Sequence, residues 1–526
     1  MARILVADPL AEDGLARLRR EGEVVVASKL AEKELVERIG DFDALVVRSE
    51  TKVTAPVLEA GKKLRVVGRA GVGVDNIDVA AATRHGILVV NAPRGNIVAA
   101  AEHTIALVLA LARSVPQADA SVRRGEWTRS KFTGVEIRGK TLGVIGLGNV
   151  GSEVSKRAHG LEMDVIAFDP VVSVDRAELF NVELVSLDDL LQRADFVTIH
   201  VPLVEANRGL IGARELGLMK PTARLVNTAR GGIVDEAALY QALKAGRPAA
   251  AAADVFDLEP PGENPLFTLP NFIGTPHIAA STVEAQASVA FDVAEEVAAV
   301  LAGDLPRYAV NAPSLPPEEL AYLRPFADLT ERLASLHRQL FGGRAGGLEL
   351  EFEGQLAQHD VNLLTAAAVK GMLQDFTEDR INAVNARLIA SARGMNIVER
   401  RTPARGSYTS LVTLKLQGHE IAGTLLMGEP RVVRIDSFRV DLHPEGRFLV
   451  SRHEDRPGIV GRVGTILGQH DVNIASMLVG RDAPRGRAMM ILAVDDAVQS
   501  SVLDHLREVD GMSDLHYVEL KGGTDS

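Results

Sequence analysis

The sequence predicts an α/β protein with two doubly wound parallel-sheet domains, followed by an α+β domain and a ferredoxin-like domain. The first 280 residues alternate short β-branched apolar runs with segments of helical periodicity, an order typical of parallel sheets with crossover helices. The alternation comes in two series, so we expect two sheets. From about residue 446 the order becomes strand, helix, strand, strand, helix, strand, which is the ferredoxin-like arrangement.

The expected strands of both series are nearly continuous in apolar residues, as strands buried on both faces of a sheet must be. The first series lies at 4–8, 23–28, 44–49, 64–71 and 87–93. The second series lies at 140–148, 164–170, 195–202, 223–231, 250–257 and 271–277.

Three segments follow the second series. A helix is expected from Ser281, where Ser281 and Glu284 have the spacing of a capping box, through an apolar stripe that ends at Leu301. Residues 303–319 are rich in proline and are predicted to be a linker. Residues 320–440 mix helical segments with alternating strands and contain no motif that indicates a chemistry.

The composition excludes several classes of function. A length of 526 residues suggests three to five domains, and the net charge of -12 without a long basic run argues against nucleic acid or a membrane surface as the main partner. The absence of cysteine excludes disulfides, thiolate catalysis and cysteine metal ligands, and no metal site is predicted. The apolar run at the N-terminus is too short for a signal peptide, and the apolar segment 97–113 is broken by Glu102 and His103, so we expect a cytoplasmic protein without a membrane span.

A glycine-rich turn follows the first strand of the second series. Its glycines, Gly146, Gly148 and Gly151, have the GxGxxG spacing, and Asp169 ends the next strand. Such a turn lets a pyrophosphate approach the backbone at a helix N-terminus, and an acidic residue after the second strand accepts from ribose hydroxyls and repels a 2'-phosphate. The pattern predicts NAD rather than NADP. The alternative is a glycine turn needed only for packing.

Three charged residues follow successive strands of the same predicted sheet: Arg230, Glu259 and His277. The carboxyl ends of parallel strands line one crevice, so these side chains are expected to meet. A histidine can accept a hydroxyl proton, a carboxylate can orient it, and an arginine can hold a substrate carboxylate bidentately. Taken singly, each also fits an ordinary structural role: a surface arginine, a solvated glutamate and a strand-end histidine. Together they predict a hydride-transfer site.

Five segments carry a resemblance to the D-isomer-specific 2-hydroxy acid dehydrogenases: residues 68–78, 91–107, 227–239, 254–261 and 275–282. Within that family the whole chain resembles the long, phosphoglycerate-specific form. Residues 453–474 resemble the ligand-binding half of an ACT domain. The resemblance implies a substrate-binding domain made of residues 1–98 and the returning helix in 282–310, an NAD-binding Rossmann domain at 99–281, an intervening domain at 311–445 and a regulatory ACT domain at 446–526.

The resemblance also implies roles for individual residues. Arg230, Glu259 and His277 take the catalytic positions. The cofactor contacts are Gly146, Gly148, Asn149, Val150, Gly151, Asp169, Val201, Thr228, Ala229, Asp254 and Ala280. The substrate contacts are Arg48, Ser49, Arg69, Val72 and Gly73, with Arg129 reaching across a subunit boundary. Some relatives have cysteine where this chain has Thr228, a difference that touches no step of the chemistry.

The function that the resemblance implies is NAD-dependent oxidation of 3-phospho-D-glycerate to 3-phosphohydroxypyruvate, the first step of L-serine biosynthesis. It implies a homo-oligomer, dimer or tetramer, with L-serine as an effector bound at paired ACT domains by His453, Asp455 and Asn473. The alternatives are a glyoxylate or hydroxypyruvate reductase, which the long C-terminal extension disfavours, and a NAD-sensing regulator of the same fold. For the ACT domain the alternative is a purely architectural module, with Asp455 and Pro457 only shaping a turn.

Overall fold

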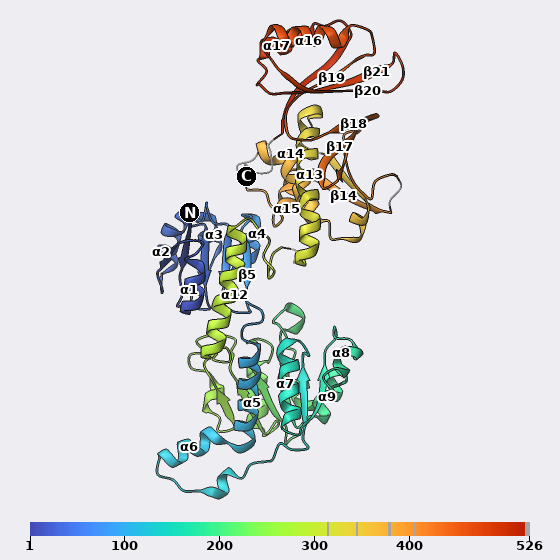
Figure 1. Ribbon diagram of the computed structural model, residues 1–526. Helices are drawn as coiled ribbons and strands as arrows, with labels where there is room; N and C mark the ends of the chain where they lie inside the picture. Colours follow the sequence, from blue (N-terminus) through green and yellow to red (C-terminus); the bar gives the residue numbers. More distant parts are fainter. Residues whose placement is uncertain (313–314, 343–345, 377–379, 404–405, 521–526) are drawn as a thin grey trace.

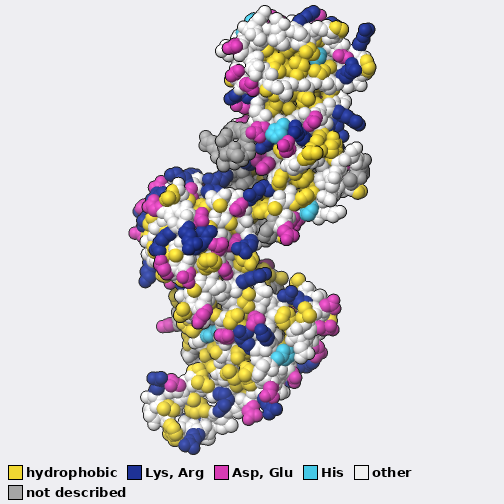
Figure 2. Space-filling model, viewed as in Figure 1, with side chains coloured by type: hydrophobic (Ala, Val, Ile, Leu, Met, Phe, Trp, Pro, Cys, Tyr) yellow, Lys and Arg dark blue, Asp and Glu magenta, His cyan; other side chains and the backbone are white. Residues whose placement is uncertain are grey.

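The computed structural model describes residues 1–312, 315–342, 346–376, 380–403 and 406–520. Its domains follow one another along an elongated molecule, with the seven-stranded domain at one end and the ferredoxin-like domain at the other (Figure 1). Two parallel sheets, a mixed sheet and a C-terminal antiparallel sheet confirm the predicted fold class. On the face seen in Figure 2, acidic and basic side chains are interspersed.

The first sheet has five parallel strands in the order β2-β1-β3-β4-β5. Alternate residues of β1 enter separate cores, with Ile4 and Val6 facing α1 and α12, and Leu5 facing α2, α3 and α4. Burial of both faces explains why these strands read as continuous apolar runs. The elements are β1 (Ala2–Val6), α1 (Glu12–Leu18), β2 (Gly22–Val26), α2 (Glu32–Arg38), η1 (Ile39–Asp41), β3 (Ala44–Val47), α3 (Ala55–Ala60), β4 (Val66–Arg69), α4 (Val79–Arg84) and β5 (Leu88–Asn91).

Helix α12 (Val283–Leu301) belongs to the first sheet although it follows the second in sequence. It packs against α1 so closely that a Cβ at Gly14 would lie 2.6 Å from the Ala290 carbonyl oxygen. The predicted cap was one residue early, because the Thr282 side chain, and not that of Ser281, accepts from the Ala285 N–H. The chain thus crosses between the two domains near residues 97 and 282, which makes the first domain discontinuous.

The second sheet has seven parallel strands in the order β12-β11-β10-β9-β6-β7-β8. The strand order reverses between β6 and β9, and in open sheets the ligand crevice lies at such a switch point. The elements are α5 (Ile97–Arg113), α6 (Val115–Arg123), η2 (Arg129–Phe132), β6 (Thr141–Ile145), α7 (Asn149–Gly160), β7 (Asp164–Phe168), α8 (Val174–Glu178), β8 (Glu183–Leu184), α9 (Leu187–Arg193), β9 (Phe196–Ile199), η3 (Glu205–Asn207), α10 (Ala213–Leu218), β10 (Arg224–Asn227), α11 (Glu236–Lys244), β11 (Ala250–Ala253), η4 (Pro265–Thr268) and β12 (Phe272–Gly274).

The remaining two sheets are largely antiparallel. The intervening sheet has the order β14-β13-β15-β16-β17-β18, and the C-terminal sheet the order β20-β21-β19-β22. The elements are α13 (Pro317–Phe341), β13 (Gly346–Gly354), η5 (Gln355–Gln358), α14 (Asn362–Leu373), η6 (Gln374–Phe376), α15 (Ala386–Ala392), β14 (Met395–Thr402), β15 (Ser410–Leu416), β16 (His419–Leu426), β17 (Glu429–Ile435), β18 (Phe438–Leu442), β19 (Gly446–Glu454), α16 (Ile459–Gln469), β20 (Ile474–Arg481), β21 (Arg487–Val494), α17 (Ser500–Arg507) and β22 (Met512–Leu520).

The intervening and C-terminal domains share one hydrophobic core. One face of the C-terminal sheet packs under α16 and α17, while the other joins the core around α13 through Phe448, Val450, Met489, Ile491, Val518 and Leu520. Gln339 on α13 adds two hydrogen bonds to the backbone of Glu519, donating to its carbonyl at 2.9 Å and accepting from its N–H at 3.0 Å. The two domains are therefore one packing unit.

The intervening domain also contacts the first sheet directly. The Asn382 side chain donates to the Gly86 carbonyl at 2.7 Å, and Asn311 in the linker donates to the Ile87 carbonyl at 2.9 Å. Within the described ranges no single helix is long and apolar enough to cross a membrane, and α5 and α6 reach that length only as a pair bent by 62°.

Candidate active site

The glycine turn is built for a close backbone approach. Gly146 has φ +94°, and a Cβ there would lie 2.7 Å from the His200 carbonyl oxygen and 2.8 Å from Val201 Cγ1. Gly151 lets α7 approach the turn, since its Cβ would lie 2.0 Å from the Gly146 carbonyl. Gly148 instead faces open space, and as N-cap of the twelve-residue helix α7 it leaves the first N–H groups without a side-chain cap. The residues therefore fit a dinucleotide pyrophosphate.

Asp169 lies directly beside that turn. Its carboxylate accepts from the Leu147 N–H at 2.8 Å and from the Val171 N–H at 2.9 Å, which fixes it at the end of β7. Val201 follows β9 across the switch point, and its Cγ1 would lie 2.8 Å from a Cβ at Gly146, so three of the residues predicted to contact the cofactor, Gly146, Asp169 and Val201, lie close together. Thr228 accompanies them at the end of β10, where its hydroxyl lies 2.8 Å from that of Thr104.

His277 and Glu259 form the ion-pair geometry that a general base requires. His277 Nδ1 lies 2.7 Å from Glu259 Oε2, and the two side chains are 42% and 37% exposed. Burial would raise the pKa of Glu259, but the hydrogen bond to His277, its charge and the Phe256 N–H together hold that pKa below its ordinary value. Glu259 is therefore ionised at neutral pH and keeps the Nδ1 proton on His277, which leaves Nε2 free to accept a proton.

Asp254 holds the turn that presents His277. The carboxylate is fully buried and accepts from the Thr275 hydroxyl at 2.5 Å, the Ile278 N–H at 2.9 Å and the Ala279 N–H at 2.8 Å. The Asp254 carbonyl accepts from the His277 N–H at 2.9 Å. These bonds maintain His277 at φ +52°, a conformation that is uncommon for residues other than glycine. The resemblance gave Asp254 a cofactor contact and not this supporting role.

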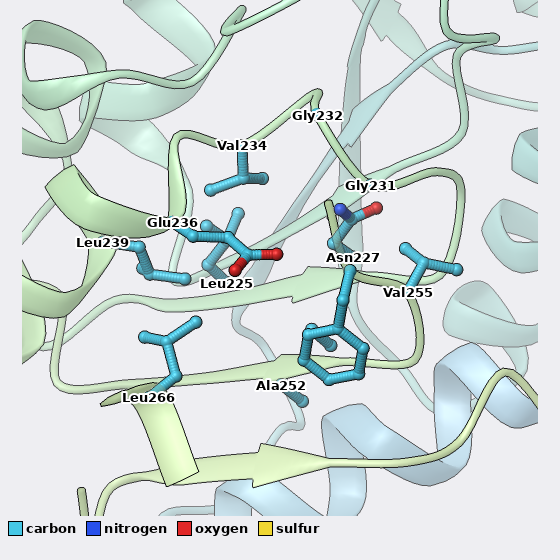
Figure 3. A pocket seen from close by; sticks show the side chains of 12 residues that line it. Leu225, Asn227, Gly231, Gly232, Val234, Glu236, Leu239, Ala252, Val255 and Leu266 are labelled. Atoms are coloured by element: carbon cyan, nitrogen blue, oxygen red, sulfur yellow. The ribbon is translucent and has the colours of Figure 1, made fainter. Parts of the chain in front are cut away.

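The loop that carries Glu259 is held in place by hydrogen bonds to the Glu236 carboxylate. Gly231, Gly232 and Glu236 line a small cavity of about 20 Å³. In Figure 3 the Glu236 side chain points into it. Glu236 accepts from the Asp257 N–H at 2.7 Å and from the Asn264 side chain at 2.6 Å. Asp257 in turn accepts from the Gly232 N–H at 2.6 Å, so the loops after β10 and β11 are tied together.

Arg230 extends from the seven-stranded domain to the five-stranded domain, the predicted NAD-binding and substrate-binding domains. Its Nε donates to Asp75 Oδ2 at 3.3 Å, and a Cβ at Gly73 would lie 2.2 Å from Nη2. Burial lowers the pKa of Arg69 to about 10. The positive charges of Arg230 and Arg48 act in the same direction, while the negative charges of Asp75 and Asp8 oppose it. Charges influence one another in this way only at short range, so three of the predicted arginines lie close to one another where the two domains meet.

The loop that carries Arg48 and Ser49 is positioned by two residues that the sequence did not indicate. Asp8, which is 1% exposed at the end of β1, accepts from the Arg48 N–H at 2.5 Å and from the Thr51 hydroxyl at 2.6 Å. Asn76 donates to the Arg48 carbonyl at 2.7 Å. Val72 is held similarly, since its carbonyl accepts from the Asn91 side chain at 2.6 Å.

Arg129 lies elsewhere in the chain. It follows α6, which lies at the end of the seven-stranded domain away from the five-stranded domain (Figure 1). Its guanidinium lies over the Trp127 ring, 5.5 Å from the ring centroid. Within one chain it does not join the other predicted substrate residues. A contribution from a second subunit stays a prediction.

The three predicted regulatory residues are also not together in one chain. Asp455 accepts from the Arg485 N–H at 2.9 Å and lies beside His453, which is buried with an unpartnered Nδ1. Asn473 precedes β20, donating to Asp495 at 2.6 Å, whereas Asp455 meets Arg481 at the other end of that strand. Strand β20 has eight residues, and a strand rises about 3.3 Å per residue, so its two ends lie about 25 Å apart. One ligand can touch both only where two modules pair.

Comparison with known proteins agrees with the fold and the site. Residues 105–279 match the family described as D-isomer specific 2-hydroxyacid dehydrogenase, NAD binding domain. The sheet, the glycine turn and this match define the class, an NAD-dependent oxidoreductase. Residues 322–436 match the D-3-phosphoglycerate dehydrogenase intervening domain, and residues 447–511 match the ACT domain.

The relatives extend over the whole chain. The D-3-phosphoglycerate dehydrogenase of Archaeoglobus fulgidus is 46% identical, covering 98% of this chain and 100% of that protein. The D-3-phosphoglycerate dehydrogenase of Methanocaldococcus jannaschii is also 46% identical, covering 99% of this chain and 100% of that protein. Among solved structures, the TT0316 protein of Thermus thermophilus aligns with a TM-score of 0.55 at 36% identity, covering 59% of this chain and 99% of that one. The chain belongs to the D-3-phosphoglycerate dehydrogenase family.

Proposed function

We propose that this protein oxidises 3-phospho-D-glycerate to 3-phosphohydroxypyruvate. The observation that carries the proposal is the hydrogen-bonded His277–Glu259 pair at a cleft where Arg48, Arg69 and Arg230 converge. A 2-hydroxy acid needs a base for its hydroxyl and a cation for its carboxylate, and a phosphate ester needs further cationic donors. The family membership supports the same reaction.

Each residue of the site has a defined task. His277 Nε2 accepts the hydroxyl proton, and Glu259 stabilises the imidazolium that forms. Arg230 binds the substrate carboxylate, while Arg48 and Arg69 supply planar donors to the phosphate. The glycine turn, with Ala229 and Ala280, would hold NAD, which would supply the acceptor for the hydride that leaves C2 of the substrate. In the reverse direction His277 returns the proton to the carbonyl oxygen.

Steady-state NADH formation tests this function. We expect turnover with 3-phospho-D-glycerate and much weaker turnover with D-glycerate, because the unphosphorylated acid leaves two arginines without a ligand. Equal rates with both acids would favour the reductase alternative. Turnover with neither would favour a NAD-sensing regulator.

Asp169 is expected to set the preference for NAD. Its carboxylate is fixed beside the glycine turn by the Leu147 N–H, and a carboxylate in that position of a dinucleotide-binding domain would repel a 2'-phosphate. Asp169→Ala should raise kcat/KM with NADP relative to NAD, measured with both cofactors at saturating substrate. A wild-type enzyme that uses the two equally would show that Asp169 has another role.

We further propose a cytoplasmic homo-oligomer that L-serine inhibits at paired ACT domains. The separation of Asp455 and Asn473 within one chain supports a site shared between two modules, in which an ammonium group would compete with Arg481 for the Asp455 carboxylate. Burial lowers the pKa of His453, so this histidine is neutral at pH 7 and can accept or donate a hydrogen bond.

A serine titration is expected to inhibit NADH formation in the wild type. Asp455→Ala and Asn473→Ala should each lose that inhibition while keeping the uninhibited rate. Asp504→Ala, which removes an exposed carboxylate from α17, is the matched control and should stay inhibited. A flat wild-type titration would mean that the module is architectural.

A further inference from the structure

Asp75 is the carboxylate that pairs with Arg230 across the cleft. Arg230 follows β10 of the NAD-binding domain, whereas Asp75 follows β4 of the substrate-binding domain. The Nε–Oδ2 distance is 3.3 Å, and the Asp75 side chain is 66% exposed. The pair therefore joins two domains and involves the guanidinium that the substrate carboxylate requires.

Asp75 differs from the other carboxylate near the arginines. The negative charges that act on Arg69 are those of Asp75 and Asp8. Asp8 is buried and its oxygens are used by the Arg48 N–H, the Thr51 N–H and the Thr51 hydroxyl, so it cannot move without unfolding the loop. Asp75 is exposed and can leave.

Arg230 keeps its orientation without Asp75. Its Nη1 donates to the Ala229 carbonyl at 2.6 Å, and Asn227 holds the turn by donating to the Arg230 carbonyl at 3.0 Å. Removal of the Asp75 carboxylate therefore leaves the guanidinium in place with free donors. The role that remains for Asp75 is to occupy those donors.

We propose that Asp75 is a displaceable counter-ion of Arg230, a residue that the substrate carboxylate must replace and that thereby lowers substrate affinity. The proposal rests on the proposed function for the role of Arg230. It requires only that the substrate carries a carboxylate beside its hydroxyl, whichever 2-hydroxy acid that is. An exposed ion pair contributes enough to change a dissociation constant about two- to five-fold.

Oxalate titrated into the NADH-saturated full-length enzyme measures this effect by calorimetry. We expect Asp75→Asn and Asp75→Ala to lower the dissociation constant of oxalate about two- to five-fold. The KM for 3-phospho-D-glycerate should fall similarly, while kcat does not rise, because the carboxylate contact is the same in substrate and transition state. Glu50→Gln, which removes an exposed charge from the loop of Arg48, is the matched control and should change neither constant.

Three outcomes would overturn the proposal. Weaker or unchanged oxalate binding in both Asp75 variants would assign Asp75 an orienting role. An equal fall in the oxalate dissociation constant of Glu50→Gln would show that the effect comes from the overall negative charge of the protein and not from Asp75 itself. Failure of oxalate to bind any variant would remove Arg230 as a carboxylate site. Absence of turnover with 3-phospho-D-glycerate, by contrast, would refute the proposed function while the oxalate titration still tests Asp75.

Discussion

His277→Ala is expected to lower kcat by about 10²- to 10⁴-fold, the range that general acid–base catalysis supplies. The imidazole is the group in the cleft that combines a carboxylate-bound Nδ1 with an available Nε2. Its loss removes the proton acceptor and leaves the glycine turn and Asp169 intact. NADH binding, measured by fluorescence titration, should therefore be unchanged.

A control separates loss of the base from loss of a histidine in general. His85→Ala alters an exposed histidine at the end of α4 and should retain full activity. A His277→Ala enzyme with most of its activity would refute the proposed mechanism. So would a parallel loss of NADH affinity, because the variant would then have damaged the cofactor site.

Asp254→Asn is expected to lower both activity and stability. The amide presents its NH₂ group to at least one of the three donors that the carboxylate now satisfies, which are the Thr275 hydroxyl and the Ile278 and Ala279 N–H groups. An unsatisfied buried group costs about 1–3 kcal/mol of unfolding free energy. Displacement of the His277 turn by an ångström is expected to cost up to about 10²-fold in kcat.

The pH dependence of stability offers a second measurement. Burial would raise the pKa of Asp254, but hydrogen bonds from His103, Thr275 and two backbone N–H groups hold it below the ordinary value of 3.8. The pKa of Asp254 is lower in the folded protein than in the unfolded chain. Ionised Asp254 therefore stabilises the fold fully at pH values above its pKa in the unfolded chain, and this stabilisation is lost as the pH falls through its pKa in the folded protein. The difference in unfolding free energy between wild type and Asp254→Asn should be constant near neutrality and shrink in acid.

Urea unfolding at several pH values measures that difference. Glu263→Gln, a change in the loop after Glu259, is a suitable control and should match the wild type throughout. A stable Asp254→Asn protein with normal kcat would show that the His277 turn does not depend on this carboxylate.

The sequence predicted the features that depend on local patterns. Continuous apolar runs marked the strands of both parallel sheets, and the glycine spacing marked the cofactor turn. The two-residue strand β8 was missed because Glu183–Leu184 is too short to show a period. The cap of α12 was placed one residue early because Ser281 and Thr282 are both good capping residues and spacing alone does not choose between them.

The supporting residues could not be predicted in the same way. Asp8 acts on Arg48 from forty positions away, and Asp254 acts on Ile278 from twenty-four. Such contacts depend on which strands are neighbours in the sheet, which periodicity does not specify. Asp75 and Arg230 are 155 positions apart and meet only because two domains face each other. Arg230, Glu259 and His277 could be proposed as catalytic from the sequence because each follows a recognisable strand, and the structure places His277 and Glu259 in contact.

The core shared by the intervening and C-terminal domains restricts how the proposed inhibition by serine can be dissected. A fragment beginning at residue 446 would expose the sheet face formed by Phe448, Val450 and Met489, which α13 covers in the intact chain. A contiguous apolar face of that kind favours aggregation. If this module alone were transferred to another enzyme, its apolar sheet face would be exposed to solvent. A segment starting at α13 would keep that face buried. The smallest exchangeable part of the C-terminal half is then the pair of domains.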